Sequence, residues 1–140
     1  MNVFLDTNVL VSAFATRGLC ADLLEIVLLE HDLAIGPQVL RELDRVLRTK
    51  FKLPRAEAKA IVEFISGEAA RIVDRVSPAS AALEPDDAVV LGEALAAQAE
   101  VLVTGDSALL DLGAFQTVRI VSPRQFWEML HSPARAGGAG

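Results

Sequence analysis

The feature that most constrains the fold is an alternation of short apolar runs with longer stretches whose apolar residues recur at helical spacing. Short uninterrupted runs are typical of buried strands in a parallel sheet, and the stretches between them are typical of crossover helices. The runs that predict strands are residues 3–5, 33–35, 101–103 and 118–121. The stretches that predict helices are residues 19–29, 37–48, 55–68, 85–97, 107–112 and 123–130, and residues 71–73 fit either a helix end or a strand. We therefore expect an α/β fold with a mostly parallel sheet.

The same alternation runs without an internal repeat or a linker, so residues 1–131 are expected to form a single domain. Residues 132–140 lack bulky apolar side chains and are expected to form a disordered tail. Cys20 is the only cysteine, so no intramolecular disulfide can form and a reducing cytoplasm is the expected location. No uncharged apolar stretch approaches about 18 residues, and we expect neither a signal peptide nor a membrane span.

The charge balance is acidic: 13 Lys and Arg residues against 19 Asp and Glu residues give a net charge of −6. Such a balance argues against a protein that coats nucleic acid indiscriminately. The surplus carboxylates can serve as a solubilising surface or as metal ligands, and composition alone does not separate the two roles.

Several carboxylates are placed where they would converge. Asp6 and Asp106 each follow a predicted strand, and the carboxyl ends of parallel strands meet at one edge of the sheet, where α/β folds bind ligands. Asp86 and Asp87 lie in the first turn of the helix that Pro85 opens, which begins at the same edge. Taken singly, each acid is explained as a helix cap or as a partner of the positive end of a helix dipole.

The convergence itself calls for a positive charge. No Lys or Arg lies within five residues of any of these four acids, although the fold could bring one closer. Clustered carboxylates in a partly desolvated cleft repel one another unless a cation is near. A divalent metal is the natural candidate, and an all-oxygen site suits Mg²⁺ or Mn²⁺ better than Zn²⁺.

A fourth acid is expected from the helix predicted at residues 37–48. Its apolar residues form one stripe, with Arg41, Arg45 and Arg48 on the opposite face. Glu42 and Asp44 lie on the two flanks of the stripe at about equal angles, so the helical period does not decide which one faces the cleft. Glu42 is nearer the helix start. Either residue could instead be a solvated flank or the i,i+4 partner of an arginine.

These residues resemble the four acidic motifs of the PIN domain family, and in particular the toxins of VapBC-type toxin–antitoxin pairs. The motifs occur in the family's order, and the match covers the chain from about residue 3 to residue 130. They are Phe4-Leu5-Asp6-Thr7-Asn8, Val39-Leu40-Arg41-Glu42-Leu43, Pro85-Asp86-Asp87-Ala88-Val89 and Val103-Thr104-Gly105-Asp106. The resemblance implies a three-layer α/β/α domain and a Mg²⁺- or Mn²⁺-dependent endoribonuclease.

The resemblance also implies roles for individual residues. It gives an acidic tetrad of Asp6, Glu42, Asp87 and Asp106. Asp6, Asp87 and Asp106 would bind the metal directly or through water, while Glu42 completes the shell or accepts a proton from the attacking water. The residues that match supporting or alternative positions are Asn8, Ser12, Thr104 and, as a substitute or second ligand, Asp86.

The partners follow in part from charge. Between Arg41 and Lys59 the chain carries seven basic and three acidic residues, a local charge of +4. This segment, with Arg41, Arg45 and Arg48, could contact RNA phosphates, dock an antitoxin or simply form a solvated helical face. The resemblance implies an RNA substrate, a cognate antitoxin and, from the family's habit, a homodimer. The family's typical basic residue near the active site has no clear match.

Two other interpretations compete with this one. A phosphatase or receiver domain also places Asp at strand ends, but it needs a second Asp two residues after the first, where Asn8 stands, or a Lys at a late strand end. A non-catalytic module that keeps the PIN scaffold and binds only protein or RNA is the main alternative. Retention of all four acids argues against it, because a pure scaffold gains nothing from mutually repelling carboxylates.

Overall fold

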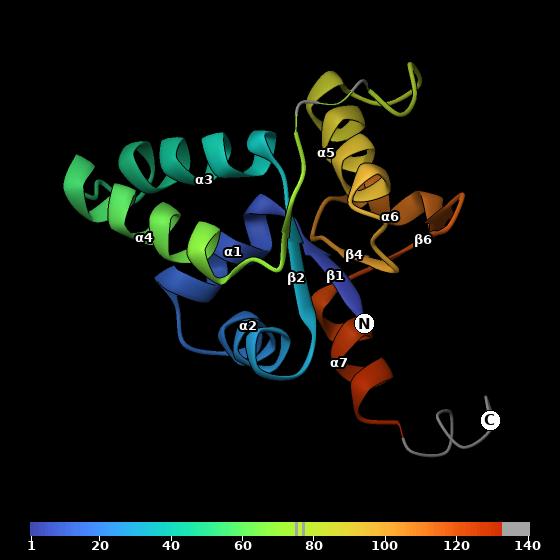
Figure 1. Cartoon of the computed structure of the whole chain (residues 1–140), viewed down its shortest axis with the longest axis horizontal. Helices are drawn as coiled ribbons and strands as arrows, with labels where there is room; N and C mark the ends of the chain where they lie inside the picture. The colour runs from blue at the N-terminus through green and yellow to red at the C-terminus, as the bar shows by residue number, and fades with distance from the viewer. Residues whose placement is uncertain (75, 77, 133–140) are drawn as a thin grey trace.

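The computed structural model describes residues 1–74, 76 and 78–132. Within them, the strands form a six-stranded sheet in the order β3-β2-β1-β4-β6-β5 (Figure 1). The strands are β1 (Asn2–Leu5), β2 (Asp32–Ile35), β3 (Arg71–Ile72), β4 (Val101–Val103), β5 (Ala114–Phe115) and β6 (Val118–Val121). Neighbouring strands are parallel except for β5, which pairs antiparallel with β6. The mostly parallel sheet is therefore confirmed.

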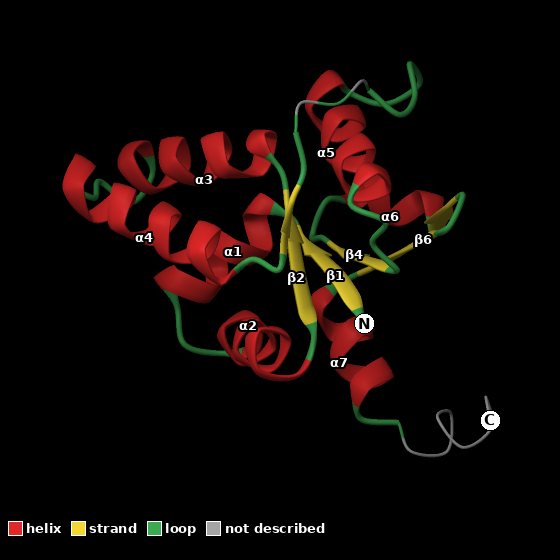
Figure 2. Cartoon of the chain, viewed as in Figure 1, coloured by secondary structure: helices red, strands yellow, loops and turns green. Residues whose placement is uncertain are grey.

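Helices cover both faces of the sheet. Figure 2 shows α5 and α6 above the half that contains β4 and β6, with α7 below it. On the other half, α3 packs against α1, α4 and α5, and α2 packs against α1, α7 and β2. The helices are α1 (Thr7–Ala15), α2 (Leu19–Glu30), α3 (Pro37–Thr49), α4 (Arg55–Glu68), α5 (Pro85–Ala96), α6 (Ser107–Leu112) and α7 (Pro123–Leu130). The three-layer arrangement is confirmed.

The elements that the sequence predicts are present at the predicted residues. The fold also contains two elements that were not predicted, α1 and β5. Helix α1 follows directly on β1 and buries Thr7, Val9, Leu10 and Val11. Its first turns carry β-branched residues, which weakens the helical signal, so burial against the sheet and the cap provided by Asp6 decide the local structure. Strand β5 is two residues long and forms the edge of the sheet, where it pairs with β6. Residues 71–73, whose sequence fitted either a helix end or a strand, contain the strand β3.

The register of the central strands brings their carboxyl ends to one edge. Leu5 of β1 lies opposite Val103 of β4. The next residue, Asp6, donates its backbone N–H to the Val103 carbonyl at 3.0 Å, and Thr104 donates to Val121 of β6 at 2.9 Å. The segments that leave β1 and β4 therefore start side by side.

No helix in the described part of the chain is both long and apolar enough to cross a membrane. Of the predicted tail, residues 133–140 lie outside the described residues. The single-domain boundary at residue 131 stays a prediction.

Candidate active site

A cleft of about 490 Å³ lies at the carboxyl edge of the central strands. It is bounded by α1, α3, α5 and the turn after β4. Its acidic lining residues are Asp6, Glu42, Asp86, Asp87 and Asp106, and its other lining residues are Thr7, Asn8, Val11, Ser12, Arg45, Val46, Lys50, Phe51 and Val90. All four acids of the predicted tetrad thus share one cleft, together with Asp86.

Asp6 is the most deeply held of these acids. Its side chain caps α1, and the residue is only 5% exposed. Oδ1 accepts the Thr7 backbone N–H at 2.7 Å, while Oδ2 accepts the Thr104 hydroxyl at 2.7 Å and the Asn8 amide at 3.2 Å. Burial raises the pKa of Asp6, and the bonds from Thr104 and Thr7 oppose that shift. The three donors partly offset the free-energy cost of burying this carboxyl group.

Asn8 and Thr104 connect Asp6 to Asp106. Asn8 Oδ1 accepts the Gly105 backbone N–H at 2.8 Å, and Thr104 Oγ1 accepts the Asp106 backbone N–H at 3.0 Å. Asp106 in turn caps α6 through the Leu109 N–H. These contacts fit the supporting role predicted for Asn8 and Thr104. Ser12 lines the cleft one turn further along α1, but no hydrogen bond among the described residues joins it to an acid.

Asp87 carries the clearest sign of crowded negative charge. Its pKa is raised to about 7, first by burial, then by a hydrogen bond with Asp106 that only a protonated pair can make, and by the charges of Asp106, Asp6 and Glu84. Its neighbour Asp86 instead accepts a hydrogen bond from Gln38 Nε2 at 3.1 Å. Of the two adjacent acids, Asp87 is the one that interacts with Asp6 and Asp106.

The structure separates the two flanking acids of α3. Glu42 lines the cleft, where Oε2 accepts the Thr7 hydroxyl at 3.1 Å and Oε1 accepts Gln38 Nε2 at 2.8 Å. Asp44 is not among the lining residues and forms an ion pair with Arg48 at 2.8 Å. Position near the helix start favoured Glu42, and the geometry agrees.

The side chains of the cleft have the right chemical type to bind a divalent metal, but they are not arranged as a preformed site. Within residues 1–74, 76 and 78–132, no three Asp, Glu, His or Cys side chains are arranged as a preformed metal site. The cleft nevertheless offers only oxygen donors, the ligands that Mg²⁺ and Mn²⁺ prefer. The fold also brings Arg45 and Lys50 to this cleft, yet the pKa of Asp87 is still raised.

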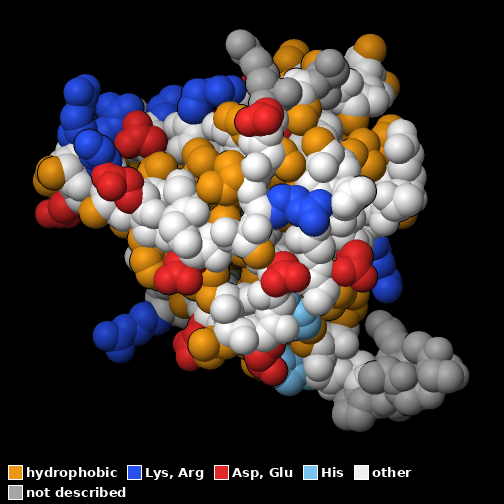
Figure 3. All heavy atoms as spheres, in the orientation of Figure 1, with side chains coloured by type: hydrophobic (Ala, Val, Ile, Leu, Met, Phe, Trp, Pro, Cys, Tyr) orange, Lys and Arg blue, Asp and Glu red, His pale blue; other side chains and the backbone are white. Residues whose placement is uncertain are grey.

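The basic residues of α3 divide into three kinds. Figure 3 shows Lys and Arg side chains gathered over the α3 and α4 end of the molecule. Arg45 lines the cleft, Arg48 is paired with Asp44, and Arg41 donates to Gln38 Oε1 at 2.7 Å. Only Arg45 of the three predicted contacts faces the acids, and Lys50 joins it there.

Sequence reasoning missed two polar residues of this site. Thr7 and Gln38 both bond Glu42, and Gln38 also bonds Asp86. The i,i+4 spacing of Gln38 and Glu42 on one helix was an available signal. The contact between Thr7 and Glu42 joins two helices and left no signal in the sequence.

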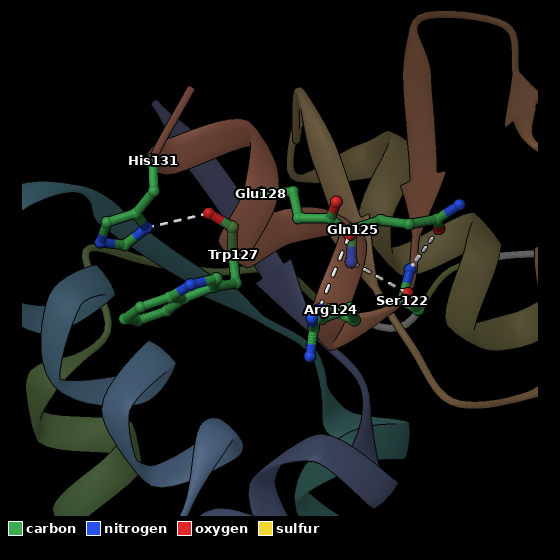
Figure 4. Close-up of polar contacts among 6 residues, drawn as sticks. All are labelled: Ser122, Arg124, Gln125, Trp127, Glu128 and His131. Atoms are coloured by element: carbon green, nitrogen blue, oxygen red, sulfur yellow. Dashed lines mark hydrogen bonds and ion pairs between the residues drawn. The ribbon is translucent and has the colours of Figure 1, made fainter. Parts of the chain in front are cut away.

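A larger surface cavity, of about 1070 Å³, lies beside α7 and lacks this chemistry. Figure 4 shows its polar contacts: Ser122 and Gln125 form a capping box, Arg124 meets Glu128, and His131 contacts the Trp127 carbonyl. Glu128 is the one acid among its lining residues. Volume therefore does not identify the candidate site, whereas the clustered carboxylates do.

The sequence of residues 2–108 matches the model of the PIN domain family. The chain belongs to the PIN domain family. Two solved structures resemble this PIN domain in fold. One is VapBC2 from Rickettsia felis bound to a DNA fragment from its promoter (TM-score 0.62, 17% identity, covering 87% of this chain and 98% of that one). The other is DNA-bound VapBC from Salmonella typhimurium (TM-score 0.60, 17% identity, covering 88% and 98%).

No curated protein matches this PIN domain by sequence. The matched range of the family model contains all four acids and ends in the first turns of α6. The cleft described above thus lies wholly within the part of the chain that defines the family.

Proposed function

We propose that this PIN domain is a Mg²⁺- or Mn²⁺-dependent endoribonuclease and the toxin of a toxin–antitoxin pair. The observation that carries the proposal is the convergence of Asp6, Glu42, Asp87 and Asp106 from four segments on one cleft. The pKa of Asp87, raised by burial and by the charges of neighbouring acids, supports a crowding of negative charge in this cleft. Phosphodiester hydrolysis uses metal ions at such sites.

The chain's own residues would divide the work as follows. Asp6, Asp87 and Asp106 would hold the metal, with Asp86 as a further ligand. A metal held there would lower the pKa of a bound water and offset the charge on the phosphate. Asn8 and Thr104 keep Asp6 and the Asp106 backbone in place. Glu42, which accepts hydrogen bonds from Thr7 and Gln38, would complete the metal shell or accept a proton from the attacking water.

The partners of this proposal are an RNA and a second protein. Both similar structures are VapBC complexes, which favours a cognate antitoxin for this chain. A cytoplasmic location belongs to the same proposal, because cellular RNA is the substrate. A homodimer is also proposed. Helix α2 buries Leu23, Leu24 and Val27 within the chain and leaves Leu29 exposed as a contact point.

The main alternative is a non-catalytic PIN module. The structure gives this alternative no added support, because in the described part of the chain the four acids form no salt bridges that would stabilise a scaffold. The ion pairs among the described residues are Arg48 with Asp44 and Arg124 with Glu128. The match to the PIN family argues against a phosphatase or receiver domain.

The proposal is tested by incubating end-labelled RNA with the purified protein in Mg²⁺, in Mn²⁺ and in EDTA, and mapping the product ends. We expect internal cleavage with either metal and none in EDTA. Mn²⁺ should also raise the melting temperature, because it binds only the folded protein. Metal-independent cleavage, or neither cleavage nor stabilisation across a panel of tRNA, rRNA and mRNA fragments, would contradict the proposal.

The basic lining of the cleft gives a separate prediction for RNA binding. Charge reversal of Arg45 and Lys50 together should weaken binding and lower the slope of log K against log salt by about one to two units, because two phosphate contacts are lost. Lys59, exposed on α4 and outside the cleft, offers a control reversal that should leave most of the slope intact. Binding is measured in EDTA, so that the RNA stays whole. Equal slopes in both variants would assign the cleft cations another role.

A further inference from the structure

Glu93 is a buried carboxylate that the proposed mechanism leaves unused. It lies in α5, is only 1% exposed, and is not among the residues that line the cleft. Neither ion pair among the described residues includes it. Burying a carboxylate costs free energy, so a side chain in this position needs compensation from its surroundings.

The start of α3 supplies a hydrogen bond to Oε2, whereas Oε1 is buried and has no hydrogen-bond partner among the described residues. This helix begins after Gly36, which has no side chain to cap it, and Pro37 in its first position has no N–H. The first free N–H is that of Gln38, and it donates to Glu93 Oε2 at 2.7 Å. Burial raises the pKa of Glu93, while the amides of Gln38 and Val39 and the charge of Arg41 oppose the shift. Glu93 is therefore the cap of a helix to which it does not belong.

Gly36 is required for this contact for a steric reason. Its backbone is extended, with φ −136°, so conformational freedom does not explain a glycine here. A Cβ atom at this position would overlap Cδ and Oε1 of Glu93. The glycine thus leaves the space that the carboxylate occupies.

The capped turn carries residues that reach the cleft. Gln38, whose backbone Glu93 holds, uses its side chain to bond Glu42 Oε1 at 2.8 Å and Asp86 Oδ1 at 3.1 Å. Glu42 is on α3, whereas Asp86 and Asp87 are on α5. A shift of the start of α3 relative to α5 would move one acid of the cleft away from the others.

We propose that Glu93 is a positioning residue that fixes the start of α3 to α5 and so sets the place of Glu42 relative to Asp87. Its catalytic consequence rests on the proposed ribonuclease function, whereas the cap itself is a property of the fold. Misplacing a catalytic group by about 1 Å can cost a reaction about a hundredfold in rate.

The first test compares Glu93→Ala, Glu93→Gln and Leu23→Ala. Leu23 is fully buried in α2, away from the cleft, so its truncation serves as a destabilised control. All variants are assayed well below their melting temperatures. Glu93→Ala should lower kcat at least about tenfold, because it disturbs the geometry of the catalytic acids. KM should stay within about twofold of the wild type, because the residues that contact RNA are unchanged. Glu93→Gln keeps an acceptor for the Gln38 N–H and should recover most of kcat.

The second test uses the steric fit of Gly36. Gly36→Ala should displace Glu93 and reproduce the loss of kcat. Combined with Glu93→Ala, it should add little, because the side chain that it would displace is already gone. Fully multiplicative losses in the double variant would overturn the proposal, as would a Glu93→Ala kcat equal to that of Leu23→Ala.

Amide hydrogen exchange separates this proposal from the ribonuclease function. Glu93→Ala should speed exchange at Gln38, and Leu23→Ala should not. If the wild type fails to cleave RNA, the proposed function fails, and amide exchange alone tests the role of Glu93. Faster exchange at Gln38 in Glu93→Ala would then support Glu93 as the cap of α3, and unchanged exchange would overturn it.

Discussion

Asp6→Asn is expected to reduce metal-dependent RNA cleavage by more than about a hundredfold, which exceeds the usual cost of losing a residue that only supports a ligand. The substitution removes the negative charge from the most buried acid of the cleft and leaves a side chain of the same size. Metal affinity should fall with it, because a neutral amide is a poor replacement for a carboxylate at a Mg²⁺ site.

The fold should survive this change. The amide oxygen can still accept the Thr7 N–H that starts α1, and Asn is as good a helix cap as Asp. The amide nitrogen can donate to Thr104 Oγ1, where the carboxylate accepted, and Asn8 loses one acceptor. A drop of a few degrees in melting temperature, from about 1 kcal/mol, is the expected cost.

The measurement is a time course on labelled RNA at matched protein purity. Asp44→Asn is the matched control, because it removes the same charge from α3 outside the cleft and breaks only a surface ion pair with Arg48. The control should cleave at close to the wild-type rate. Equal activity of Asp6→Asn and the wild type would show that a contaminant or another site cuts the RNA.

Asp87→Asn should abolish cleavage and yet stabilise the metal-free protein. The pKa of Asp87 is raised from 3.8 to about 7 in the folded state, so the folded protein holds this proton more tightly than the unfolded chain does. The stability gained from that proton is complete below pH 4 and is lost as the pH rises towards 7 and above. Above pH 7 the wild type carries an unfavourable charge that the variant lacks.

The expected result is read from thermal melts in EDTA at pH 5 and pH 8. From pH 5 to pH 8, the melting temperature of the wild type should fall further than that of Asp87→Asn. At pH 8 the variant should therefore melt at a higher temperature than the wild type. Saturating Mn²⁺ should reverse the order, because only the wild type gains from binding. Asp111→Asn, on exposed α6, controls for the loss of one negative charge. A variant with the wild-type pH dependence would contradict the crowding of carboxylates around Asp87.

The order of the elements and much of the site could be predicted from the sequence because both follow from periodicity. Uninterrupted apolar runs indicated the parallel strands, and parallel strands necessarily bring Asp6 and Asp106 to one edge. Pro85 marked the start of α5 and so placed Asp87 at that edge.

Other features depend on tertiary contacts and left no local pattern. The flanks that carry Glu42 and Asp44 are equivalent on an isolated helix, and only packing of α3 against α1 and α5 separates them. Helix α1 was missed because burial outweighs its weak intrinsic signal. In the sequence, Glu93 looks like any other acid on a helix, because its contact with the Gln38 N–H at the start of α3 exists only in the fold.

Two of the proposed catalytic acids also start helices: Asp6 caps α1 and Asp106 caps α6. This double use has an evolutionary consequence. A lineage that no longer needs the activity cannot discard these side chains freely, because their loss also weakens the fold. Asn and Ser still cap a helix well, whereas Ala does not. Inactivated descendants of this chain should therefore drift to Asn or Ser at positions 6 and 106, and keep the outline of the cleft long after its chemistry has gone.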